Sequence, residues 1–111
     1  MALTPLLAFG SGAAWVATRG DDTLTRISPR GTQVDRIDLP SIPTRVSVGG
    51  GSIWVTALEA GRLLRVDPQA RRLVERIDTG ARPFALDVEH GERVWVTLLT
   101  RGAVQPVTFS R

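Results

Sequence analysis

The chain has 111 residues, a length typical of one domain, and 42% of them are hydrophobic, which is enough for a packed core and argues against disorder. The formal net charge is +3, and all fourteen basic residues are arginine, a usage that favours a GC-rich bacterial genome. The absence of cysteine excludes disulfides, thiolate metal sites and cysteine nucleophiles.

Short strands separated by glycine- and proline-containing turns are predicted from one end of the chain to the other. Alternation of polar and apolar residues and runs of β-branched residues carry this prediction, and no helical period of useful length is found. In chain order the predicted strands are 7–9, 14–17, 23–27, 33–38, 44–48, 52–57, 62–67, 72–78, 84–88, 94–98 and 103–107.

The strands belong to a repeated unit of about 40 residues. Successive tryptophans, at Trp15, Trp54 and Trp95, are 39 and 41 positions apart, and each follows a proline, at Pro5, Pro43 and Pro83. Four short strands in a unit of this length are typical of a propeller blade. We therefore predict an all-β chain, a β-propeller segment of about three four-stranded antiparallel blades. A β-sandwich is the alternative, but its strands would not recur with the same residues at one period.

The predicted blades span residues 1–40, 41–80 and 81–111, and the last one lacks its outer strand. In a propeller both faces of a blade are covered by neighbours, so an arc of three leaves two apolar faces open. We expect such faces to be covered by further blades of a longer protein. Head-to-tail association of two chains into a six-bladed ring is the alternative.

The repeat resembles the streptogramin lyase-like and YVTN-type β-propeller repeats of bacteria. The residues that carry the likeness in the second unit are Pro43, Ile53-Trp54-Val55, Arg65-Val66-Asp67-Pro68 and Arg76-Ile77-Asp78. The resemblance implies a ring of six or seven blades, of which this chain would be a part. It also implies, for the lyases, a central site of histidine, glutamate and a divalent metal, and no residue of this chain matches that set.

Ligands of propellers usually bind to the loops that ring the central channel. The polar candidates there are Arg19, Asp21, Glu59, Arg82 and Arg101, together with Asp87, an acidic residue at a repeat position that holds Ser47 in the second unit. The three tryptophans are expected to pack between blades, with their indole N–H groups bound to carbonyl oxygens. His90 is expected in a solvated turn, and we predict no metal, cofactor or catalytic residue.

The predicted function is a non-catalytic scaffold for ligand sensing or protein interaction within a larger bacterial protein. A fragment of a streptogramin (virginiamycin B) lyase-like enzyme is the alternative. Nucleic acid is not an expected partner, because arginines such as Arg26 and Arg65 alternate with carboxylates and are expected to be solvated edge residues. No signal peptide or membrane segment is expected in the chain, which we take as soluble; the parent's compartment stays open, an extracytoplasmic one included.

Overall fold

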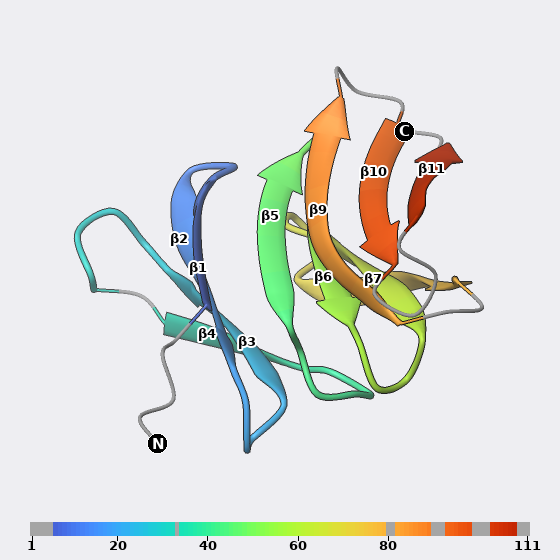
Figure 1. Ribbon diagram of the computed structural model, residues 1–111. Helices are drawn as coiled ribbons and strands as arrows, with labels where there is room; N and C mark the ends of the chain where they lie inside the picture. Colours follow the sequence, from blue (N-terminus) through green and yellow to red (C-terminus); the bar gives the residue numbers. More distant parts are fainter. Residues whose placement is uncertain (1–5, 33, 80–81, 90–92, 99–102, 109–111) are drawn as a thin grey trace.

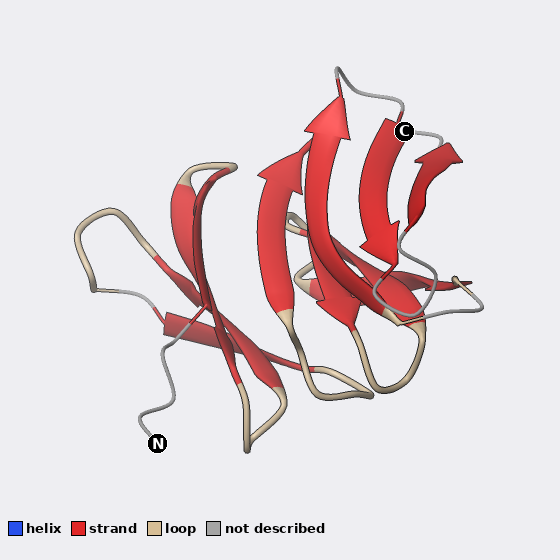
Figure 2. Cartoon of the chain, viewed as in Figure 1, coloured by secondary structure: helices blue, strands red, loops and turns tan. Residues whose placement is uncertain are grey.

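Eleven β-strands make up the regular structure of the described part of the chain. The computed structural model (Figure 1) describes residues 6–32, 34–79, 82–89, 93–98 and 103–108. No described residue is helical (Figure 2), and accordingly this part holds no helix able to cross a membrane.

The strands form three antiparallel sheets, each a meander in which neighbours in sequence are neighbours in space. The first sheet has four strands, β1 (Leu6–Gly10), β2 (Ala13–Thr18), β3 (Thr23–Ile27) and β4 (Val34–Asp38). The second has β5 (Arg45–Gly49), β6 (Ser52–Ala57), β7 (Arg62–Asp67) and β8 (Arg72–Asp78). The third has three, β9 (Pro83–Glu89), β10 (Arg93–Leu98) and β11 (Ala103–Thr108).

All eleven predicted strands are confirmed, with bounds that differ by at most one residue in the described part. Gln33, the predicted first residue of the fourth strand, lies outside the described residues. The fold is that of a β-propeller segment, and the last sheet has no fourth strand among the described residues. The division of the chain at residues 40 and 80 stays a prediction.

The first strands of the three sheets, β1, β5 and β9, lie side by side on one side of the molecule (Figure 1). From this row of inner strands each sheet extends outward to its last strand. The molecule measures 42 × 36 × 18 Å, which is the flat shape of an arc of blades.

One rule describes both interfaces between sheets: the tryptophan face of one sheet packs on the aliphatic face of the next. Trp15 and Leu24 of the first sheet pack with Ile53, Val55 and other residues of the second in one buried cluster. Trp54 and Leu63 of the second sheet pack with Val94, Val96 and other residues of the third. The second sheet is therefore covered on both faces, and its strand β6 is buried along its whole length.

The two buried tryptophans are held alike. Trp15 Nε1 donates to the carbonyl oxygen of Gly10 at 3.0 Å, and Trp54 Nε1 donates to that of Gly49 at 3.1 Å. Both side chains are fully buried, so the prediction that they pack between sheets is confirmed. Trp95 differs, with 36% of its surface exposed, because no described sheet covers that side of the third sheet.

Arg26 and Arg65 are not the solvated edge residues that the sequence predicts. Only 16% of each side chain is exposed. The Arg65 guanidinium lies 5.4 Å from the centre of the Trp54 ring and donates from Nε to Ser52 Oγ at 2.8 Å. The prediction is wrong here because an arginine paired with a tryptophan across two strands shares its face and covers it with the side chain's length.

Candidate binding surface at the loop end

We call "loop end" the end of the sheets formed by the β2–β3 and β6–β7 turns and the linkers between sheets. Backbone hydrogen bonds join linkers to turns in the same way in two repeats. Leu39 N donates to Asp22 O at 2.8 Å, and Thr79 N donates to Gly61 O at 2.9 Å. Each linker is thereby tied to a turn of the sheet it leaves, so the loop end is a fixed surface on which side chains can be positioned.

The predicted site residues lie apart from one another. Arg19 and Asp21 share the β2–β3 turn, Glu59 lies in the β6–β7 turn, and Arg82 precedes β9. All four are exposed. Asp87 is exposed within β9, where its carboxylate accepts a hydrogen bond from Val88 N at 3.0 Å.

Two predictions fall outside the described residues, those for Arg101 and His90. Among the residues that the structure describes, no three histidine, aspartate or glutamate side chains gather as a metal-binding group.

One side-chain contact at the loop end joins two sheets. The guanidinium of Arg45, at the start of β5, lies 4.3 Å from the centre of the Phe84 ring, near the start of β9. Arg45 Nη1 also donates to Thr44 O at 2.9 Å, and Thr56 Oγ1 donates to Phe84 O at 2.8 Å. The stack is therefore held from both sides, with an exposed arginine on a half-buried ring.

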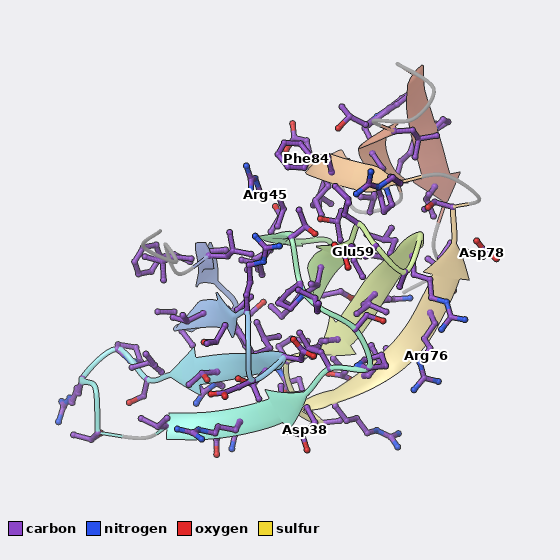
Figure 3. The ribbon with its side chains drawn as sticks, turned by 60° about the horizontal axis from the view of Figure 1, so that its bottom comes forward. Asp38, Arg45, Glu59, Arg76, Asp78 and Phe84 are labelled. Atoms are coloured by element: carbon purple, nitrogen blue, oxygen red, sulfur yellow. The ribbon has the colours of Figure 1, made fainter. Side chains whose placement is uncertain are left out.

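Figure 3 places this stack among the other charged groups. Arg45, Phe84 and Glu59 lie toward the inner strands, whereas Asp38, Arg76 and Asp78 lie along the outer strands β4 and β8. The inner half of the loop end thus carries a cation fixed on an aromatic ring, with a carboxylate in the neighbouring turn.

The sequence did not single out Arg45, although it contained a signal. Arg45 pairs with Thr56 as Leu6 pairs with Ala17, so an arginine stands where the first repeat has leucine. The comparison between repeats that selected Asp87 would have selected Arg45 too.

Two of the hollows that the described residues line are at the opposite end, near the β1–β2 and β5–β6 turns. The larger, of about 600 Å³, is lined mainly by apolar surface that includes Phe9, Ala14 and Ile27. The smaller, of about 230 Å³, is lined by Ser52, Arg65 and their neighbours. Neither hollow includes a predicted site residue.

No protein-family model matches the chain, and no curated protein matches it in sequence. Solved structures do match it. A virginiamycin B lyase from Staphylococcus aureus is similar with a TM-score of 0.76 and 17% identity, over 96% of this chain and 42% of that one. A streptogramin B lyase has a TM-score of 0.69 and 17% identity, over 96% and 41%.

A third similar structure is the BBS1N part of a complex with ARL6DN, with a TM-score of 0.77 and 16% identity, over all of this chain and 39% of that one. The chain thus spans less than half the length of these structures. Identities this low show the fold alone, and these likenesses support the conclusion that the chain is a segment of a β-propeller.

Proposed function

We propose that the chain is a non-catalytic binding scaffold within a ring completed by further blades, and that its loop end recognises carboxylate groups of a partner protein or peptide. The observation that carries this proposal is the contact of Arg45 with Phe84 across two sheets.

The chemistry of a stacked guanidinium supports the choice of ligand. The ring covers one planar face of the Arg45 guanidinium at 4.3 Å, and one N–H is directed to Thr44 O. A guanidinium has five N–H donors in a planar fork that matches a carboxylate. Because the stack restrains the side chain before binding, less rotamer entropy is lost when an anion is bound. The net charge of +3 also favours acidic partners over basic ones.

Titration calorimetry with N-acetylated, C-amidated hexaglutamate tests the proposal. The wild type is expected to bind this peptide and not the matching hexalysine, and Arg45→Ala is expected to weaken binding about tenfold or more. Phe84→Leu, which keeps the apolar volume but removes the aromatic face, is expected to weaken it by a smaller factor.

Arg76→Ala is the matched control, since it removes the same charge from an exposed position on an outer strand (Figure 3). Equal losses of affinity for hexaglutamate in Arg45→Ala and Arg76→Ala would mean that net charge alone attracts the peptide. Absence of any binding by the wild type would remove the proposed ligand class.

A part in a streptogramin lyase-like enzyme is the second candidate, favoured by the two lyases among the similar structures. In that case the ring that contains this chain should convert virginiamycin B, which mass spectrometry would detect. Conversion that survives Arg45→Ala would favour the lyase over the binding scaffold.

A further inference from the structure

The two faces of the arc that no described sheet covers differ from each other at the positions where sheets meet. Inside the chain, the last residue of an inner strand is glycine in both sheets whose tryptophan face is covered. A Cβ atom on Gly10 would lie 2.6 Å from Val48 Cγ1, and one on Gly49 would lie 2.7 Å from Val88 Cβ. The next inner strand therefore approaches too closely for any side chain at this position.

The residues around these glycines are small as well. By register, Gly10 is paired with Ala13 and Gly49 with Ser52, and both partners are buried. Two residues earlier on the inner strand stand Ala8 and Ser47, paired with the tryptophans. A tryptophan face that docks on the next sheet thus has three small, neutral residues beside its indole.

The third sheet has charged residues at all three positions. Asp87 is paired with Trp95, and Glu89 is paired with Arg93, so these residues replace Ser47, Gly49 and Ser52 of the second sheet. The Arg93 guanidinium lies 5.6 Å from the centre of the Trp95 ring and covers it. A sheet docked as the internal ones are would need glycine where the third sheet has Glu89, and it would take the Asp87 carboxylate out of water, which is costly for a charged group.

The outer part of the third sheet also differs from the repeat at the position beside the tryptophan. Pro106 is paired with Trp95, at the position that Arg26 and Arg65 hold in the other sheets. Those arginines form ion pairs with Asp35 and Glu75 on the fourth strands, at 3.5 and 3.4 Å. Proline offers no such pair and has no N–H, which is why it is found at sheet edges.

The open aliphatic face of the first sheet keeps the pattern of the faces that receive a tryptophan face inside the chain; we call such a face an acceptor face. Phe9 is paired with Ala14 as Val48 is with Ile53 and Val88 with Val94, so Phe9 holds the position that meets a glycine of the preceding sheet. It is 74% exposed, beside the apolar hollow of about 600 Å³. Leu7 and Val34 are also exposed, at 53% and 57%.

We infer that only one of the two open faces of the segment docks a blade in the way that its own sheets dock on one another. The aliphatic face of the first sheet receives a tryptophan-bearing sheet of this repeat with small residues beside its indole, as in the two internal interfaces. The third sheet does not dock in this way, so a second copy of the chain does not complete the ring head to tail. This inference rests on the proposed completion of the ring by further blades.

A designed donor tests the inference against the wild-type chain as acceptor. The donor carries Asp87→Ser, Glu89→Gly and Arg93→Ser, which restore the residues of the second sheet, and Phe9→Asp, which blocks its own acceptor face. Sedimentation velocity of a mixture with the wild type is expected to show a 1:1 complex of twice the 12.0 kDa chain mass. Phe9→Asp alone, mixed with the wild type, is the matched control and is expected to form none.

Equal complex formation by donor and control, or none by a folded donor, would overturn the inference. Circular dichroism establishes that each variant is folded. If the donor fails to fold, acrylamide quenching of the wild type still decides. Acrylamide quenching reports mainly on Trp95, because Trp15 and Trp54 are buried and Trp95 is 36% exposed. We expect the quenching of Trp95 to be the same at all protein concentrations. Loss of that quenching on concentration would show the third sheet docking on another copy. Hexaglutamate binding is a separate measurement, so the two proposals fail separately.

Discussion

At the scale of single residues, the packing of sheet on sheet depends on where a side chain is missing. Gly10 and Gly49 each accept an indole N–H on the carbonyl oxygen and leave room for a valine of the next inner strand. In each sheet the indole hydrogen bond and the close approach of the valine involve the same glycine, because inner strands are the closest parts of neighbouring sheets. A single methyl group at this position is therefore expected to act on the interface between sheets and not on the strand itself.

Gly49→Ala tests this, because the added Cβ would lie 2.7 Å from Val88 Cβ. We expect a loss of about 1–3 kcal/mol in the free energy of unfolding, the usual cost of overpacking. In a Val88→Gly background the loss should be much smaller, because that change removes the Cβ atom of Val88 together with its two methyl groups. Urea denaturation of the four proteins measures this coupling.

Gly51→Ala is the control. Gly51 has a φ of +77° but no atom within 4 Å of its added Cβ, so its cost of about 1 kcal/mol should not depend on Val88. Equal costs of Gly49→Ala with and without Val88 would contradict the close-approach explanation.

At the scale of elements, the linkers are joined to the turns by hydrogen bonds that recur between repeats, and the linker before β5 is joined through a side chain as well. Thr44 is buried, its N–H donates to Thr56 O at 2.7 Å, and its Oγ1 accepts from Leu58 N at 3.2 Å. One threonine thus holds the start of β5 against the end of β6, immediately beside Arg45.

Thr44→Val keeps the shape but removes the acceptor for Leu58 N. The Leu58 N–H is half-buried, so losing its partner should cost less than the roughly 1–3 kcal/mol of a fully buried group, and we expect a loss of about 1 kcal/mol in the free energy of unfolding by urea denaturation. Hydrogen exchange at the Leu58 amide should become faster. The exposed Thr32 provides the control, since Thr32→Val should change stability by less than about 0.5 kcal/mol. Unchanged exchange at Leu58 would contradict this role for Thr44.

At the scale of the whole molecule, the second sheet stands between two buried clusters while the first and third are each covered on one face. Stability should therefore be uneven, because segments with more buried apolar contacts open at higher free energy.

Native-state hydrogen exchange is expected to show the slowest amides in β6 and β7, with faster exchange in β4 and β10. The residues of β6 are buried without exception, whereas β4 has one buried residue among five and β10 has three among six. Protection in β4 or β10 equal to that of β6 would show that the arc opens only as one unit.

The candidate site was less predictable than the fold. The turns and linkers that hold Arg19, Asp21, Glu59 and Arg82 followed from the repeat, and the structure places these residues exposed as expected for loops. The Arg45 and Phe84 contact did not follow, because it joins residues 39 positions apart on different sheets. Sequence periodicity orders residues within a sheet but carries no distance between sheets.

The sequence by itself determined the strands, their order within each sheet and the all-β class, since alternation and turn residues act over a few neighbouring positions. Only the tertiary structure decided which side chains meet between sheets. It placed Val48 against Gly10, Arg65 over Trp54, and Trp95 on an open face. The physical reason is that these contacts depend on how closely and at what angle one sheet lies on the next, which the pattern along a single strand does not contain.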